Sequence, residues 1–217
     1  METSAEATVE FLLLEKYCMR RRAASPPPEI AVFQGLFPAP RGRRLALQSR
    51  TSEAAVQGKR PRDVLEDVAE KITGIADSIS ISPKIASDGD DDSNDGDEDV
   101  IPRLVELLRQ SGDQLDKEIK KNPDLARFLT NSFSYNLFAT ITNSFLQRVA
   151  PSRAPITQQA QIAMTFEVTR RLSALDLQPM NRVMGFGAQY LQQNFSSWVH
   201  QRGGWERAFQ EDDHEVQ

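Results

Sequence analysis

The residues whose types and spacing come closest to a chemical site form an acidic run at 87–99, SDGDDDSNDGDED, with eight acids and no base. If Gly96 is the sixth position of a calcium-binding loop, oxygen-bearing side chains recur at suitable spacing. These are Asp91, Ser93, Asp95, Asp97 and Asp99. Position twelve is then Pro102, where such a loop needs a bidentate glutamate. The run is interpreted as a solvated, self-repelling and disordered loop, and no metal site is predicted.

Residues for catalysis or cofactor binding are few. The chain has two histidines, His200 and His214, and neither is spaced with a nucleophile and a second orienting group. Gly185 and Gly187 lack the preceding strand and the third glycine of a nucleotide-binding loop, so close helix packing is the better interpretation. The sequence predicts no enzyme, no cofactor and no small-molecule substrate.

A segment that could bind another protein lies directly after the acidic run, at Leu104–Ile119 (LVELLRQSGDQLDKEI). Its apolar residues recur at helical spacing and predict one amphipathic helix that buries a single face. Gly112 and Asp113 lie beside this face, and the small glycine would let a second helix approach closely. An ordinary core helix with an incidental Gly-Asp pair is the alternative.

A second motif, Trp198–Phe209 (WVHQRGGWERAF), follows about ninety residues downstream. Gly203 and Gly204 permit a sharp backbone bend, because glycine has no Cβ to oppose positive φ. The chain's two tryptophans, Trp198 and Trp205, flank the bend and can cover a helical core with large apolar surfaces. We interpret the motif as a structural helix corner.

Helical periodicity recurs through the rest of the chain and predicts an all-α fold. The expected helices cover residues 63–79, 124–131, 132–149, 157–175 and 179–199. A short helix is also expected at 7–20. We predict a mostly disordered N-terminal extension at 1–60, one domain at 61–211 and a polar tail at 212–217.

Charge and composition predict the compartment of the protein and which partners it lacks. Residues 1–60 carry ten basic and six acidic residues, but they lack interleaved aromatic residues, so nucleic-acid binding is not expected. The single cysteine, Cys18, fits a reducing compartment. No apolar run reaches the roughly 20 residues of a membrane-spanning helix. A cytosolic protein without stable membrane insertion is expected, with peripheral attraction of its basic N-terminal segment to anionic intracellular membranes.

Taken in order, the segments Leu104–Ile119 and Trp198–Phe209 resemble homology regions of the Bcl-2 family of apoptosis regulators. The resemblance implies that the upstream helix is a BH-3-like ligand whose leucines enter a groove of prosurvival members of the family. The partner-binding positions would be Leu104, Leu108, Ser111, Gly112, Asp113 and Leu115. Asp113 would pair with an arginine of the groove, whereas Ser111 stands where the family usually has an apolar anchor, which predicts weaker binding.

The resemblance also implies a Bcl-2-like bundle around a central hydrophobic helix, Thr157–Leu175. Gln161 then occupies the place of the arginine that would receive a partner's aspartate. Glu167, Arg170 and Arg171 on the same helix disfavour direct pore formation, because charges at bilayer depth are costly. The implied function is regulation, expected to be facilitation, of apoptosis through protein contacts. A helical scaffold or adaptor in another process, such as trafficking, is the alternative.

Overall fold

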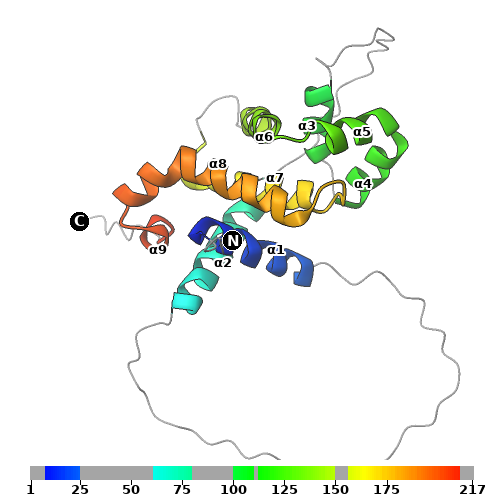
Figure 1. The fold of residues 1–217 in the computed structure, drawn as a ribbon. Coiled ribbons are helices and arrows are strands. Elements are labelled where there is room, and N and C mark those ends of the chain that lie inside the picture. Colours follow the sequence, from blue (N-terminus) through cyan, green and yellow to red (C-terminus); the bar gives the residue numbers. More distant parts are fainter. Residues whose placement is uncertain (1–7, 25–60, 80–99, 110–111, 150–155, 211–217) are drawn as a thin grey trace, which may run out of the picture.

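The computed structural model describes residues 8–24, 61–79, 100–109, 112–149 and 156–210. Within these residues the regular structure is helical (Figure 1). The helices are α1 (Val9–Ala24), α2 (Pro61–Ser78), α3 (Val100–Arg109), α4 (Gly112–Lys121), α5 (Pro123–Asn131), α6 (Tyr135–Val149), α7 (Gln158–Ser173), α8 (Met180–Gln201) and α9 (Trp205–Ala208). The acidic run, most of the N-terminal sixty residues, Ser111 and the polar tail lie outside the described residues.

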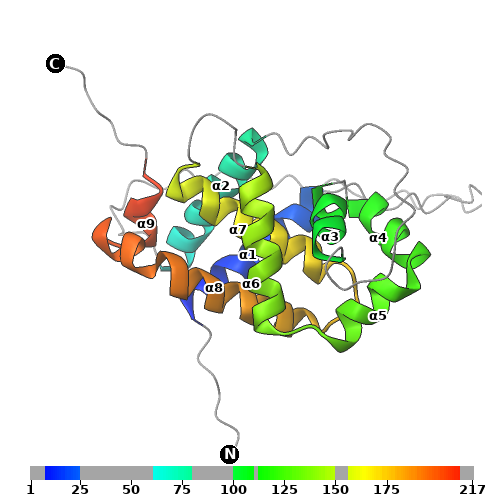
Figure 2. The ribbon, with the colours of Figure 1, turned by 90° about the horizontal axis from the view of Figure 1, so that it is seen from above.

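The centre of the bundle is α7, and this confirms the prediction of an all-α fold around this helix. It begins after Thr157, whose hydroxyl accepts a hydrogen bond from the backbone amide of Ala160 at 3.2 Å and so caps the helix. It packs against α1, α2, α3, α6 and α8 (Figure 2). Most of its residues are buried, from Ala160 to Ser173. This enclosure buries polar residues as well as apolar ones, and the hydroxyls of Thr165 and Thr169 donate to carbonyls one turn earlier in the helix.

The short helix expected near the N-terminus is present as α1, and it is part of the core. Leu13, Leu14 and Tyr17 are fully buried, and α1 packs on α2, α7 and α8. On the outside, Lys16 and Arg20 reach the carboxylate of Glu66 on α2, at 2.7 and 3.0 Å. The hydrophobic core therefore includes residues that precede position 61, where the sequence placed the start of the domain.

The other helices agree closely with the periodicity, with differences at their ends. Residues 132–134 are not helical, so α6 begins at Tyr135 rather than Ser132. Phe133 lies in this connection and is buried. Pro179 precedes α8 as its N-cap residue, consistent with the extended conformation that it adopts. None of the described helices is long and apolar enough to cross a bilayer.

The crossing of α8 over α7 and α1 depends on one glycine. A Cβ atom built on Gly187 would lie 2.6 Å from Thr169 Oγ1 and 3.1 Å from Leu14 Cδ1. Thr169 is buried and its hydroxyl is bonded to the carbonyl of Thr165 at 2.7 Å, so its side chain has little room to move. A Cβ atom built on Gly185, one half-turn earlier, would meet no such neighbour within 4 Å. Of these two glycines, only Gly187 is required by close packing.

We therefore expect Gly187→Ala and Gly185→Ala to change stability in opposite directions. The first should destabilise the fold by about 1–3 kcal/mol, through overpacking at the helix crossing. The second should stabilise it by up to about 1 kcal/mol, because alanine is the better residue in a helix interior. Urea denaturation of both variants measures the difference. A stabilising Gly187→Ala would show that the helices do not approach as closely as described.

Candidate partner-binding segment

The segment predicted as a single ligand helix forms two helices, α3 and α4, and the prediction of one continuous helix is wrong. α3 ends at Arg109 and α4 begins at Gly112, and the two run in different directions (Figure 1). Residues 110 and 111 between them lie outside the described residues. Gly112 is the first residue of α4, a position where glycine costs less than it does in a helix interior.

The predicted anchor leucines face inward. Leu104 and Leu108 on α3 are 0% exposed and Leu115 on α4 is 1% exposed, so all three belong to the core. α3 packs on α6 and α7, whereas α4 packs on α3 and α5. The side chains of Gly112 and Asp113 lie outside what the structure describes. In this conformation the leucines stabilise the protein's own bundle.

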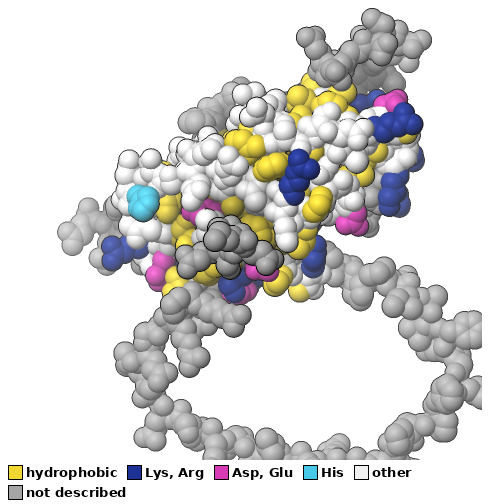
Figure 3. Space-filling view, in the orientation of Figure 1, with side chains coloured by type: hydrophobic (Ala, Val, Ile, Leu, Met, Phe, Trp, Pro, Cys, Tyr) yellow, Lys and Arg dark blue, Asp and Glu magenta, His cyan; other side chains and the backbone are white. Residues whose placement is uncertain are grey.

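The outer face of the segment is basic. Lys117, Lys120 and Lys121 are exposed on α4, and Arg127 is exposed on α5. Lys and Arg side chains gather at this end of the molecule (Figure 3). Lys121 lies 2.6 Å from Glu118 on its own helix, an exposed pair that contributes little to stability. α4 is thus amphipathic, with Leu115 and Ile119 inside and lysines in water.

Polar contacts connect α3 to its neighbours. Arg103 donates to the side-chain oxygen of Asn122 at 3.0 Å, before α5. The Oε2 atom of Glu106 lies 3.8 Å from Nη1 of Arg148 on α6. Arg171 of α7 donates from Nη1 to the main-chain carbonyl of Leu108. This last contact is the most buried of the three, since the Arg171 side chain is only 11% exposed.

Arg171 belongs to a buried charge cluster around Glu167 on α7. The Glu167 side chain is 5% exposed and accepts hydrogen bonds from Arg170 (2.6 and 3.0 Å), Arg171 (2.7 Å) and the hydroxyl of Tyr17 on α1 (2.8 Å). Burial alone would raise the pKa of Glu167, but the bonds and positive charges of Arg170 and Arg171 outweigh it and lower the pKa to about 2. Burial, followed by the charge of Glu167, raises the pKa of Tyr17, so its hydroxyl keeps the proton that it donates.

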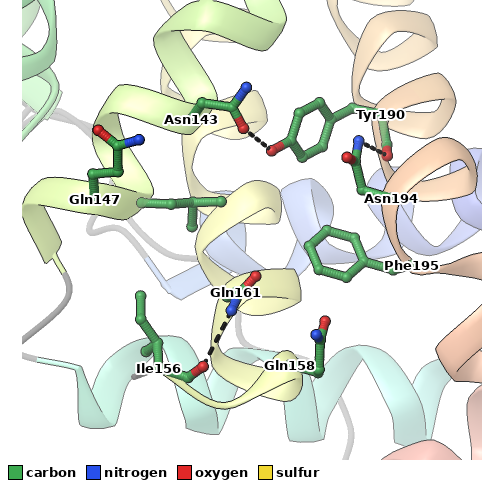
Figure 4. A pocket seen from close by; sticks show the side chains of 9 residues that line it. Asn143, Gln147, Ile156, Gln158, Gln161, Tyr190, Asn194 and Phe195 are labelled. Carbon is green, nitrogen blue, oxygen red and sulfur yellow. Dashed lines mark hydrogen bonds between the residues drawn. The ribbon is translucent and has the colours of Figure 1, made fainter. Parts of the chain in front are cut away.

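An open cavity of about 430 Å³, lined by both polar and apolar side chains, lies between α6, α8 and the beginning of α7, where the family resemblance places the groove arginine. The group at that position is Gln161, whose side-chain nitrogen donates to the carbonyl of Ile156 at 3.1 Å (Figure 4). Asn143 and Tyr190 form a 2.5 Å hydrogen bond across the opposite wall. Among the residues that the structure describes, the lining side chains are amide, phenol and apolar groups, and none of them is a cation that could pair with a ligand's aspartate.

The predicted helix corner lies where α8 ends and α9 begins. Gly203 (φ 85°) and Gly204 (φ 102°) take backbone conformations that suit glycine. Their amides bond to the carbonyls of His200 (3.0 Å) and Val199 (2.9 Å), a Schellman arrangement that satisfies the last carbonyls of α8.

Aromatic contacts fix the position of α9. Trp205 stacks on Phe209 with ring planes 7° apart, and Trp198 meets the edge of Phe209. Trp205 also contacts Phe166 of α7, and its indole NH donates to Glu10 of α1 at 3.4 Å. The corner therefore joins both ends of the described chain to the central helix.

Comparison with curated proteins finds relatives whose name describes them as Bcl-2-like, in agreement with the resemblance seen in the sequence. The relatives are proteins named apoptosis facilitator Bcl-2-like protein 14. The chain is 44% identical to the Homo sapiens protein over 116 residues, which make up 52% of the chain and 35% of that protein. The Rattus norvegicus protein is 43% identical over 54% of the chain and 36% of its own length, and the Bos taurus protein 40% identical over 58% and 39%.

The matched part thus spans little more than a third of the length of these relatives. No protein-family model matches the chain, and no solved structure matches it.

Proposed function

We propose that this protein is a non-enzymatic facilitator of apoptosis that acts by presenting residues 100–121 to the groove of a prosurvival Bcl-2 protein. The main support for this proposal is a row of three anchor leucines on helices that pack at the end of the bundle. They are Leu104, Leu108 and Leu115. The name of the relatives supports the cellular process. We place the protein in the cytosol, with peripheral contact to intracellular membranes through its basic N-terminal residues.

Presentation of the segment requires its release from the core. Exposing three buried leucines costs roughly 5–9 kcal/mol, at about 1.5–3 kcal/mol for each side chain. A partner groove would bury the same leucines again and recover much of this free energy. Binding to the folded protein should therefore be weaker than binding to the free segment by the free energy of release.

The burial of the same leucines also favours the second candidate, a Bcl-2-like scaffold or adaptor in a process such as trafficking. In that case α3 and α4 are permanent parts of the core, and a prosurvival groove would have no affinity for the segment. Binding by the isolated segment distinguishes the two functions.

The test is a titration of a peptide covering residues 100–121 against a panel of prosurvival Bcl-2 proteins. We expect Ser111→Ile to tighten binding about tenfold or more, because a buried isoleucine contributes roughly 1.5–3 kcal/mol. Lys117→Ala, on the polar face of α4, is the matched control and should leave the affinity unchanged. Weaker or unchanged binding by Ser111→Ile would show that the anchor positions are assigned wrongly.

A further inference from the structure

The contact between Arg171 and Leu108 lies at the C-terminal end of α3. Leu108 is the next-to-last residue of this helix, so its carbonyl is among the last four, which lack a partner within the helix. Arg171 on α7 donates to this carbonyl, and a guanidinium there also opposes the partial negative charge at a helix C-terminus. A buried cation of the central helix thus fixes one end of the candidate ligand segment.

The position of Arg171 is in turn set by Glu167. Arg171 Nε donates to Glu167 Oε1 at 2.7 Å, while Nη1 is directed to α3. The other carboxylate oxygen, Oε2, accepts the Tyr17 hydroxyl at 2.8 Å. Arg170 of the same helix also binds both oxygens, Oε2 at 3.0 Å and Oε1 at 2.6 Å, so loss of the Tyr17 bond would loosen the carboxylate and weaken, without abolishing, the alignment of Arg171.

Tyr17 extends this connection to the N-terminal helix. Its ring packs edge-on against Phe166, with 5.5 Å between ring centroids, and its oxygen accepts hydrogen bonds from Arg21 at 3.2 Å. Arg21 donates to Asp77 of α2 at 2.5 Å. A continuous set of polar contacts therefore runs from α2 and α1, through Glu167 and Arg171, to the carbonyl of Leu108.

We propose that this set of contacts is a latch that keeps α3 in the bundle, and that α1 controls it through Tyr17. Arg171 is the positioning residue for α3, and Glu167 transmits the state of α1 to it. When α1 is in place, Arg171 holds Leu108. When the Tyr17 contact is lost, α3 opens more often while α6, α7 and α8 stay folded. The biological meaning of this opening rests on the proposed function, whereas the latch itself requires no partner.

Hydrogen exchange of the backbone amides of the full chain tests the latch directly. Arg171→Gln should speed exchange in α3 about tenfold or more, because a buried hydrogen bond from a charged donor is lost. Tyr17→Phe keeps the ring but removes the hydrogen bond to Glu167. Because this bond acts on α3 only through Arg171, the variant should speed α3 exchange less, about threefold to tenfold. Exchange in α8 should change much less in either variant.

Two control variants make the same chemical changes, arginine to glutamine and tyrosine to phenylalanine, at positions outside the Glu167 cluster. Arg182→Gln removes an arginine that donates to the carbonyl of Phe133 at 2.8 Å, away from α3. Tyr190→Phe removes the hydroxyl bonded to Asn143 at 2.5 Å. Neither should speed exchange in α3 selectively. Tyr17→Phe combined with Arg171→Gln should exchange no faster in α3 than Arg171→Gln alone, because both act through one set of contacts.

If the two substitutions increase the exchange rate of α3 additively in the double variant, α1 does not control the latch. If exchange is accelerated equally in α3 and α8, the latch does not exist. Both results are independent of the peptide titration. If the latch variants open α3 as expected but the peptide binds no prosurvival protein, the latch stands and the proposed function fails. If the peptide binds but α3 exchange is unchanged in both variants, the latch fails and the proposed function stands.

Discussion

Truncation of Leu115 to alanine is expected to destabilise the folded protein by about 2–5 kcal/mol. Leu115 is fully enclosed on α4, where it packs with the core together with Ile119, and the substitution leaves a cavity beside the neighbouring α3 and α5. Urea or thermal unfolding followed by circular dichroism measures the loss. A change of this size would make Leu115 one of the positions most sensitive to truncation.

Lys117→Ala on the same helix is the control for the effect of substitution itself. Its side chain is exposed, so its free energy of unfolding should stay within about 0.5 kcal/mol of the parent protein. If Leu115→Ala unfolds like Lys117→Ala, α4 does not pack on the core, and the segment is displayed permanently instead of being released.

A second large effect is expected for Glu167→Gln at neutral pH. The substitution leaves Arg170 and Arg171 without the carboxylate that they share, and breaking a buried ion pair from one side costs about 3 kcal/mol. We take the lower end of the usual range because the Arg170 side chain is 24% exposed and keeps part of its hydration. Unfolding by denaturant at pH 7 gives the difference, with Glu70→Gln as a control at an exposed carboxylate on α2.

The ionisation of Glu167 should also make the free energy of unfolding depend on pH. The pKa of Glu167 is lowered to about 2 in the folded protein, from an ordinary value of 4.5. Its ionised form therefore stabilises the fold above pH 4.5, and this contribution is lost as the pH falls from 4.5 toward 2. Arginine side chains stay charged throughout this range, so within the cluster the carboxylate is the group that changes.

Glu167→Gln should accordingly lose less stability than the parent protein between pH 5 and pH 3. Denaturant unfolding at several pH values follows this difference. Parallel stability curves for the two proteins would mean that Glu167 is not held as an ionised group among the arginines.

The helices that sequence periodicity predicted well are those with one clearly apolar face. α2 covers nearly the same residues as the expected helix at 63–79, because its apolar residues recur every three or four positions. α7 and α8 were found in the same way. Periodicity also placed the anchor leucines on a buried face, but it did not separate α3 from α4, since the apolar residues of the two helices follow one spacing.

Long-range partners were not visible in the sequence. Tyr17 and Glu167 are 150 positions apart, and no local pattern links them. The charges on the central helix were recognised as unusual for an apolar helix, but their compensation depends on α1 and α3 packing there together. The role of α1 was hidden for a related reason, because its buried residues, Leu13, Leu14, Tyr17 and Cys18, lie beside a basic sequence that is typical of an exposed tail.

The central claim is that residues 100–121 are a partner ligand held inside the fold. The most direct measurement compares the affinity of one prosurvival Bcl-2 protein for the free peptide and for the full 217-residue chain. We expect the peptide to bind at least about a hundredfold more tightly, because the chain must first expose its buried leucines. We also expect Leu108→Ala to weaken binding in both forms. Absence of peptide binding, or binding by the chain that Leu108→Ala leaves unchanged, would contradict the claim.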